Sequence, residues 1–298
     1  MSNRSAELVT RLKAAADPVR LRLLSLCRQG ECSVSELNAV VGLSQPRMSQ
    51  QLKVLCDAGL LQRFRDGQRV YYRWPQGSAA TSDLKHLLAL LPEDEPQFAA
   101  DATRLRQLRR HDASPDIPGA GETEPHDRAL HRAILDLTVT QSVGDLLDVG
   151  CGRGQLLKLL SSRANRAVGV DIDSEARDLA RADLMLAGLS NCTLRKGDMY
   201  SLPFEPANFD TIILDDVLPS ADRPVEVLLE AQRVLRPDGK LLLLQRIDSG
   251  QGDAMLRDLA TWCADARLRM SPARYVSTEN PRWLLTEARP VASSSVAA

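Results

Sequence analysis

The segment from Leu146 to Gly154 reads Leu-Leu-Asp-Val-Gly-Cys-Gly-Arg-Gly, and Asp171 follows 17 residues after its last glycine, at the end of Ala-Val-Gly-Val-Asp. An apolar strand therefore leads into a glycine-rich turn, a helix begins, and a second strand brings a carboxylate beside the turn. This order is typical of an adenosyl ligand bound across the carboxyl ends of parallel strands in an open sheet. It constrains this part of the chain to an α/β, Rossmann-like fold.

Length and charge predict a second, different domain in front of this one. A chain of 298 residues exceeds the usual size of a single domain. Residues 1–90 hold 13 Lys and Arg against 7 Asp and Glu, a net of +6, and the remainder has a net of −7. A basic block of this size suits a polyanionic partner, because each neutralised phosphate releases counterions.

The lack of a targeting signal in the sequence and the spacing of the cysteines lead us to expect a cytoplasmic protein. No apolar run approaches the roughly 20 residues of a membrane span, and the first residues lack the apolar core of a secretory signal. The six cysteines contain no C-x-x-C pair. We therefore expect reduced thiols and not a disulfide framework.

The N-terminal block carries the start and stop signals of successive helices. Asp17 can cap a helix, and Pro18 after it fits the first helical position because its missing N–H would be unpaired there. Ser33-Val-Ser-Glu36 is a capping box, and Gly42 ends the short helix that follows it. These signals predict a helix, a turn and a second helix that begins after Ser44, which we expect to cap it.

The second of these helices has a polar face suited to reading DNA. Met48, Leu52 and Leu55 recur at helical spacing and form its inner side. Its outer side presents donor-rich residues of the kind that contact base edges and phosphates, and the candidates are Ser44, Gln45, Arg47, Ser49, Gln50 and Lys53.

An arginine-rich hairpin follows. Two strand-like segments, 60–65 and 68–74, flank Asp66-Gly67, which is a strong two-residue hairpin signal. Four arginines lie on it as on a wing that touches phosphates: Arg63, Arg65, Arg69 and Arg73. The alternative is a helical subdomain with an ordinary polar face and a solvated hairpin. The ordered set of capped helix, glycine turn, donor-faced helix and hairpin favours DNA binding.

Residues 15–75 resemble the arsenic-repressor (ArsR/SmtB) family of winged-helix regulators. The matching text is Asp17-Pro-Val-Arg-Leu-Arg-Leu-Leu, then Leu43-Ser-Gln-Pro-Arg-Met-Ser-Gln-Gln-Leu-Lys-Val-Leu-Cys-Asp-Ala-Gly-Leu-Leu61, then the hairpin. The resemblance implies a symmetric homodimer that binds two half-sites of double-stranded operator DNA and regulates transcription.

The chain departs from the arsenic-sensing members at their metal site. Those members carry Cys-Val-Cys where this chain has Ser33-Val34-Ser35. Cys32 lies one position away, and a three-thiolate site from Cys27, Cys32 and Cys56 remains an alternative. Small buried cysteines are the commoner outcome, so we expect no bound metal.

Proline and glycine punctuation divides the chain. A leucine-rich helix over 81–91 suits dimer contact or packing on the winged helix, and Pro92 follows it. An arginine-rich helix and then the segment 114–122, with two prolines and two glycines, form a linker. We predict a winged helix-turn-helix domain over 1–92, mostly α with a β-hairpin wing. A helical segment and linker cover 93–125, and a second domain covers 126–298.

The second domain alternates strands and helices, which predicts a mainly parallel sheet covered on both faces. The expected strands are 145–149, 166–170, 191–196, 209–214 and 240–245, and the expected helices are 155–163, 174–187 and 224–234. Segments 268–276 and 281–288 are candidates for two further strands.

Glycine spacing separates this domain from the nicotinamide-binding folds that share its pattern. The dinucleotide fingerprint G-x-G-x-x-G requires glycine at position 155, where this chain has Gln155. Gly154 makes the pattern G-x-G-x-G instead. With the later segments Gly197-Asp-Met-Tyr-Ser-Leu-Pro-Phe204, Phe209–Asp216 and Leu235-Arg-Pro-Asp-Gly-Lys-Leu, residues 128–245 resemble the class I S-adenosyl-L-methionine-dependent methyltransferases.

This resemblance implies a set of residues for S-adenosyl-L-methionine or S-adenosyl-L-homocysteine. The glycines of the turn let the backbone approach the ligand, Asp148 supports the turn or meets the ligand's ammonium, and Asp171 accepts from the ribose diol. Ile172 offers an apolar face to adenine, Asp198 and Met199 hold the adenine edge and ring, and Asp215 lies where cofactor and acceptor meet. The full set is Asp148, Gly150, Gly152, Gly154, Asp171, Ile172, Asp198, Met199 and Asp215.

Two functional hypotheses follow from the sequence. The first is a transcription regulator whose methyltransferase-like domain senses the adenosyl ligand as an effector. The second is an active methyltransferase that acts on a small molecule, with the winged helix controlling its expression or location. Asp215-Asp216-Val-Leu-Pro stands where related enzymes often have a histidine or an aromatic residue, and no acceptor-pocket signature or catalytic residue is evident.

Overall fold

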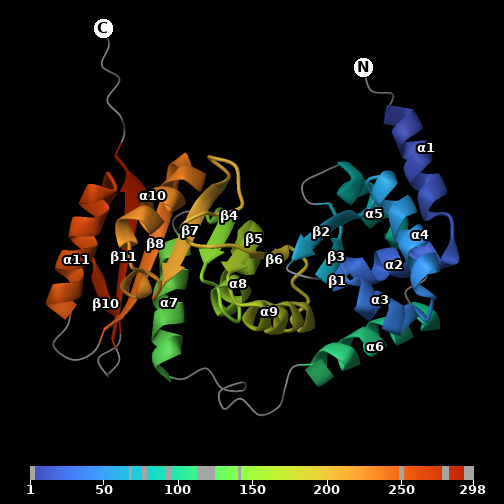
Figure 1. Cartoon of the computed structure of the whole chain (residues 1–298), viewed down its shortest axis with the longest axis horizontal. Helices are drawn as coiled ribbons and strands as arrows, with labels where there is room; N and C mark the ends of the chain where they lie inside the picture. Colours follow the sequence, from blue (N-terminus) through green and yellow to red (C-terminus); the bar gives the residue numbers. More distant parts are fainter. Residues whose placement is uncertain are drawn as a thin grey trace, which may run out of the picture. The chain divides into compact units, whose positions relative to one another are not determined.

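The computed structural model describes residues 4–66, 69–75, 79–90, 95–112, 125–139, 142–247, 252–276 and 282–291. The chain divides into two compact units (Figure 1). The first comprises Met1–Pro115 with Arg181–Thr193, and the second comprises Asp116–Ala180 with Leu194–Ala298. No helix in the described ranges is both long and apolar enough to cross a membrane.

The first unit is a winged helix-turn-helix, as the sequence predicts. A three-stranded sheet of order β1-β3-β2 accompanies its helices. The elements are α1 (Arg4–Ala15), α2 (Pro18–Arg28), β1 (Cys32–Ser33), α3 (Val34–Val41), α4 (Gln45–Asp57), β2 (Gln62–Asp66), β3 (Arg69–Arg73), α5 (Ala79–Ala89) and α6 (Pro96–Asp112).

Local capping sets where these helices begin. Asp17 Oδ1 accepts the Val19 and Arg20 amides at 2.9 and 3.0 Å, ahead of Pro18 in the first turn of α2. The predicted capping box is present, because Glu36 N donates to Ser33 Oγ at 3.2 Å and Ser33 N donates to Glu36 Oε2 at 2.6 Å. Each bond satisfies a backbone N–H that the helix itself leaves unpaired.

The wing forms because β2 and β3 pair antiparallel from Gln62↔Arg73 to Asp66↔Arg69. The predicted turn residue Gly67 lies outside the described residues. The strand β1 joins β3 through Cys32↔Tyr72 and Ser33↔Tyr71, so the wing is anchored at the start of α3.

Helix α6 is fastened to the winged helix by buried ion pairs. Arg22 of α2 donates through Nε and Nη2 to the two oxygens of Asp101, at 2.6 and 2.8 Å. Arg109, which is 4% exposed, donates to Glu36 Oε1 and, at 2.6 Å, to the Glu31 carbonyl. These bonds satisfy charges that would otherwise be costly to bury.

The second unit contains a sheet of order β10-β11-β8-β7-β4-β5-β6, with β9 pairing β11. Strands β4, β5, β7 and β8 are parallel, and β8–β11 and β11–β10 are antiparallel. The strands are β4 (Gly144–Val149), β5 (Ala164–Asp171), β6 (Cys192–Lys196), β7 (Phe209–Asp215), β8 (Leu235–Ile247), β9 (Leu268–Met270), β10 (Arg274–Val276) and β11 (Arg282–Pro290).

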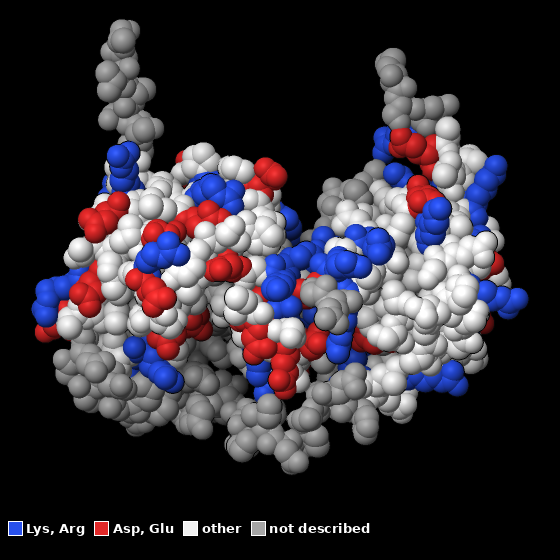
Figure 2. Space-filling view, in the orientation of Figure 1, with Lys and Arg blue, Asp and Glu red and all other residues white. Residues whose placement is uncertain are grey.

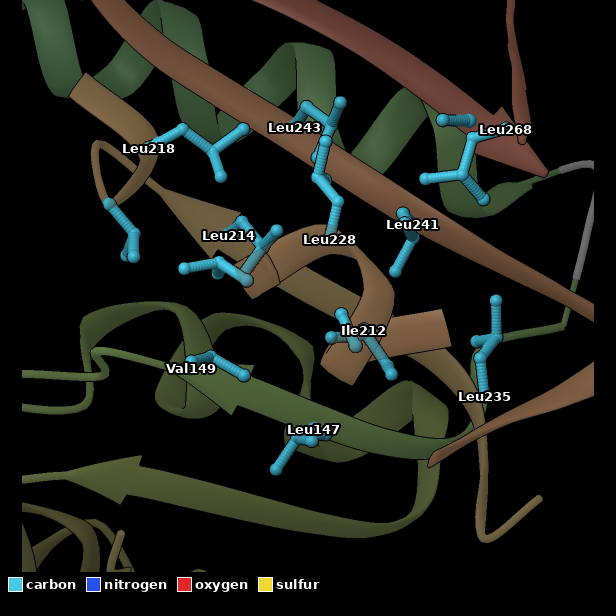
Figure 3. Packing of buried hydrophobic residues seen from close by; sticks show 14 of the residues in the cluster. Leu147, Val149, Ile212, Leu214, Leu218, Leu228, Leu235, Leu241, Leu243 and Leu268 are labelled. Carbon is cyan, nitrogen blue, oxygen red and sulfur yellow. The ribbon is translucent and has the colours of Figure 1, made fainter. Parts of the chain in front are cut away.

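Helices cover this sheet because its strands are apolar on both sides. They are α7 (Pro125–Val139), α8 (Gln155–Leu160), α9 (Ser174–Leu186), α10 (Pro224–Val234) and α11 (Gly252–Asp265), with short 3₁₀ turns at Ser161–Arg163 and Leu218–Ser220. Figure 3 shows Leu147 of β4, Ile212 of β7 and Leu241 of β8 in one core with Leu228 of α10. This confirms the predicted Rossmann-like fold with a mainly parallel sheet.

Several element ends differ from the predicted ranges, and two of them differ by three residues or more. The predicted helix over 155–163 stops at Leu160 and closes with the 3₁₀ turn. Strand β8 begins at Leu235 and not at residue 240, because Leu235 already pairs with Phe209 before a register shift. The predicted linker 114–122 lies outside the described residues.

Candidate adenosyl-ligand site and nucleic-acid interface

The turn after β4 is built from glycines in the left-handed region. Gly150, Gly152 and Gly154 have φ of 71°, 48° and 72°. The turn closes against the next strand, since Gly150 N and Cys151 N both donate to Val170 O, at 2.7 and 3.1 Å. A Cβ added at Gly152 would meet nothing within 4 Å, so this backbone faces open space that a ligand can approach.

Asp171 joins the turn to the end of β5. Its Oδ2 accepts the Gly152 amide at 2.8 Å, and its Oδ1 accepts the Asp173 amide at 2.9 Å. Each carboxylate oxygen has a further lone pair, so these bonds leave capacity for a ribose hydroxyl. The two halves of the sequence signature therefore meet at one edge of the sheet.

Asp148 lies buried at the same edge, near the end of β4. It is 1% exposed, and its Oδ1 has no hydrogen-bond partner among the described residues. Burial raises the pKa of Asp148 well above its ordinary value, and the negative charges of Asp215 and Asp171 raise it further. These surroundings favour the neutral form of Asp148 more than water favours that of an ordinary aspartate.

The neighbouring thiol is buried and is poorly suited to act as a nucleophile. Cys151 lies within the glycine turn, and burial, followed by the charges of Asp148 and Asp171, raises the pKa of its thiol. A buried thiol that keeps its proton is inert, so Cys151 fills space beside the turn.

The remaining predicted ligand residues fall after the parallel strands. Ile172 follows β5 and is 66% exposed, an unusual state for isoleucine that leaves an apolar face for a ring to cover. Asp198 follows β6, is exposed, and accepts the Tyr200 amide at 3.0 Å. Met199 is partly buried against the core. Asp215 is the last residue of β7 and not the residue after it.

Arg177 is a residue of this site that the sequence reasoning missed. It is 2% exposed, and its Nη1 donates to the Asp171 carbonyl at 3.0 Å, so it fixes the end of β5 from within α9. The available signal was its place one turn into the helix that follows Asp171, on the side that faces the sheet.

The predicted recognition helix has the expected two faces. Met48, Leu52 and Leu55 are fully buried. The six candidate DNA contacts are exposed: Ser44, Gln45, Arg47, Ser49, Gln50 and Lys53. One detail of the prediction is wrong, because Ser44 occupies the N-cap position of α4 without making a side-chain cap bond. Its hydroxyl is therefore available to an outside partner.

The wing arginines divide into two groups. Arg63, Arg65 and Arg69 are exposed, and Figure 2 shows positive side chains gathered over the area where Figure 1 draws β2 and β3. Arg73 instead lies 3.4 Å from Glu31 and 5.3 Å from the centre of the Phe64 ring. It stabilises the wing, whereas the other three lie at the surface of the protein.

The cysteines of the first unit are buried or half-buried free thiols. A hydrogen bond to Cys32 and then burial raise the pKa of Cys27, and burial raises that of Cys56. Within the described ranges, no three His, Cys, Asp or Glu side chains are placed to hold a metal ion.

Both parts of the chain match known families. The model of the bacterial regulatory proteins of the arsR family matches residues 17–63, and that of a methyltransferase domain matches residues 147–243. The biofilm growth-associated repressor of Agrobacterium fabrum is 41% identical over 80 residues, which are 27% of this chain and 68% of the repressor. The arsenic resistance transcriptional regulator ArsR1 of Pseudomonas putida is 36% identical over 104 residues, 35% of this chain and 80% of the regulator.

The second unit has relatives of its own. The 24-methylenesterol C-methyltransferase 2 of Oryza sativa is 34% identical over 128 residues, 42% of this chain and 35% of that enzyme. A SAM-dependent methyltransferase from Aquifex aeolicus has a TM-score of 0.50 at 20% identity, over 56% of this chain and 94% of that one. The [4+2]-cyclase SpnF has a TM-score of 0.50 at 18% identity, over 59% and 86%. The two structures show a shared fold and not a shared reaction.

The fold and the two family matches define this protein as a winged helix-turn-helix regulator domain followed by a methyltransferase domain. The chain belongs to the arsR family of bacterial regulatory proteins.

Proposed function

We propose that this protein is a DNA-binding transcription regulator whose methyltransferase-like domain binds S-adenosyl-L-methionine or S-adenosyl-L-homocysteine as its effector. It acts in the cytoplasm as a homodimer on double-stranded operator DNA. The observation that carries the ligand assignment is the hydrogen bond between Gly152 N and Asp171 Oδ2, which holds the glycine turn open beside a carboxylate.

The residues at this edge fit an adenosyl ligand. Gly152 leaves backbone exposed to open space, and Ile172 leaves an apolar face uncovered. The buried Asp148 oxygen lacks a partner that a ligand's ammonium would supply. We assign ligand binding to Asp148, Gly150, Gly152, Gly154, Asp171, Ile172, Asp198, Met199 and Asp215.

The DNA assignment is supported by the exposed donors on α4 and the wing. Ser44, Gln45, Arg47, Ser49, Gln50 and Lys53 would lie in the major groove, and Arg63, Arg65 and Arg69 would touch phosphates. An effector that binds one dimer conformation more tightly shifts the DNA-competent population by that difference in affinity.

The test combines calorimetry and DNA binding. Both adenosyl ligands are titrated into the full chain, and affinity is measured for a duplex that the protein selects from a random-sequence pool, with and without ligand. Asp171→Ala should abolish ligand heat and leave DNA binding of the free protein intact, whereas Arg47→Ala should do the reverse. An unchanged DNA affinity at saturating ligand would refute the effector role.

A second candidate function is methyl transfer to a small molecule. Asp216, directly after β7, has φ of 55°, and its Oδ1 accepts the Arg246 amide at 3.1 Å. Non-glycine residues in this region often mark functional sites. S-adenosyl-L-methionine would supply an activated methyl group when bound, and the protein would align the acceptor and exclude water. Turnover with an acceptor from a screened panel would establish this function.

A further inference from the structure

Three carboxylates meet at the carboxyl ends of three neighbouring strands. Asp148 comes from β4, Asp171 from β5 and Asp215 from β7, and β4 lies between the other two in the sheet. Both carboxylate oxygens of Asp171 accept backbone amides of the loop around it. Asp148 differs, because it is 1% exposed and its Oδ1 has no hydrogen-bond partner among the described residues.

The charges that act on Asp148 are mostly negative. Asp171 and Asp215 face it from the adjacent strands, and both raise its pKa. The Cys151 thiol stands in the turn above it and keeps its proton. Arg177 of α9 donates to the Asp171 carbonyl, and Arg153 belongs to the glycine turn. These negative charges make an added positive charge favourable at this place, and a proton bound to Asp148 is one way to supply it.

The two adenosyl ligands differ in charge. S-adenosyl-L-methionine carries an ammonium, a sulfonium and a carboxylate, a net of one positive charge, whereas the homocysteine form has a neutral thioether and no net charge. A cation that arrives beside Asp148 stabilises the ionised carboxylate and replaces the proton electrostatically. Both ligands bring an ammonium, so the extra positive charge that only S-adenosyl-L-methionine adds to this group of carboxylates is its sulfonium.

We propose that Asp148 is a charge-selecting residue of the adenosyl site, which loses its proton to solvent when a cationic ligand binds and so favours the sulfonium over the thioether. The inference rests on the proposed function, since it requires that the site binds adenosyl ligands. It specifies how that site would be regulated. The protein would sense the ratio of S-adenosyl-L-methionine to S-adenosyl-L-homocysteine through the net charge of the bound ligand, and its response would depend on pH.

The test is calorimetry of the full chain at one pH in two buffers of different ionisation enthalpy, phosphate and Tris. The buffer dependence of the heat gives the number of protons released. We expect on the order of one proton per bound S-adenosyl-L-methionine and fewer for S-adenosyl-L-homocysteine. Sinefungin, in which an amine-bearing carbon replaces the sulfonium, should behave like the methionine form.

Two variants make the test specific. The Asp148→Asn variant should bind without proton release and lose roughly tenfold more affinity for the sulfonium form than for the thioether form, the order of one added attraction between unlike charges. Asp238→Asn is the matched control, because Asp238 is exposed near the start of β8, at the opposite edge of the sheet. It should release protons as the unmodified chain does.

A measurement on the unmodified chain covers the case in which Asp148→Asn fails to fold. Its affinity for S-adenosyl-L-methionine should rise with pH, by up to about tenfold per unit while Asp148 is protonated in the free protein, and its affinity for the homocysteine form should rise less. Binding of both ligands with equal proton release, or with none, would overturn the charge-selection proposal and leave the proposed function standing. Absence of binding by either ligand would instead refute the proposed function.

Discussion

The two units differ in whether their buried charged side chains have a hydrogen-bonded partner. In the first, Arg109 is buried against Glu36 and the Glu31 carbonyl, and Arg22 holds both oxygens of Asp101. In the second, Asp148 is equally buried and its Oδ1 has no hydrogen-bond partner within the described ranges. Paired charges fix one helix against another, whereas an unsatisfied buried carboxyl is costly and indicates a place where a ligand completes the structure.

The pKa shifts reflect this contrast. Burial by itself raises the pKa of Glu36, but the guanidinium of Arg109 and the amide of Ser33 lower it overall. Burial also raises the pKa of Asp148, and there the nearest charges are carboxylates that raise it further. Burial of a carboxyl thus goes with a lowered pKa in the first unit and a raised pKa in the second.

The largest expected effect is the loss of a paired charge. Arg109→Ala should destabilise the winged helix by about 3–5 kcal/mol, because it removes the buried guanidinium that pairs with the half-buried Glu36 carboxylate. Thermal unfolding of the full chain, followed by circular dichroism, measures the change in its first transition. A loss below about 1 kcal/mol would show that α6 does not depend on this pair.

Removal of the unpaired charge should have the opposite sign. Asp148→Asn is expected to stabilise the ligand-free protein near pH 8 by about 1–3 kcal/mol. Because the folded pKa of Asp148 is raised, this carboxyl contributes stability below the ordinary aspartate pKa, and that stability is lost as pH rises towards the folded value. Urea unfolding at pH 4 and pH 8 checks this, since the difference between variant and unmodified chain should vanish at the lower pH.

The glycine turn of the second unit leaves its backbone open to a ligand, and its left-handed conformation is one that only glycine adopts without strain. Gly152→Ala should cost about 1–2 kcal/mol in stability from its left-handed backbone, and it should weaken adenosyl-ligand binding at least about tenfold by filling the space before the turn. Gly59→Ala is the matched control, since Gly59 has φ of 68° and equally open surroundings in the first unit. Ligand binding by that control should be unchanged in calorimetry, and equal losses in both variants would contradict the assignment of the turn.

The smallest expected effect concerns a single cap. Ser33→Ala should destabilise the first unit by about 1 kcal/mol, because it removes the acceptor of the Glu36 amide. Hydrogen exchange of the first-turn amides of α3 measures the local change. Ser44→Ala, at an N-cap without a side-chain bond, should leave the exchange of α4 amides nearly unchanged and weaken binding to the selected DNA duplex.

The sequence by itself determined the features that depend on neighbours along the chain. Asp17 and Ser33 cap helices as predicted, because a cap needs only amides two or three residues away. The strand, glycine turn and second strand that end at Asp171 also follow from local pattern, and with them the class of fold.

Tertiary structure decided which charges became paired. Arg109 reaches Glu36 across 73 positions of sequence, and no local pattern indicates that pairing. Burial of Asp148 among carboxylates from β5 and β7 likewise arises only when the parallel strands assemble side by side. Strand β8 begins at Leu235 for a similar reason, since its first residue pairs with Phe209 of β7. Local signals specify helices and turns, whereas the cost or benefit of a charge depends on the groups that folding places around it.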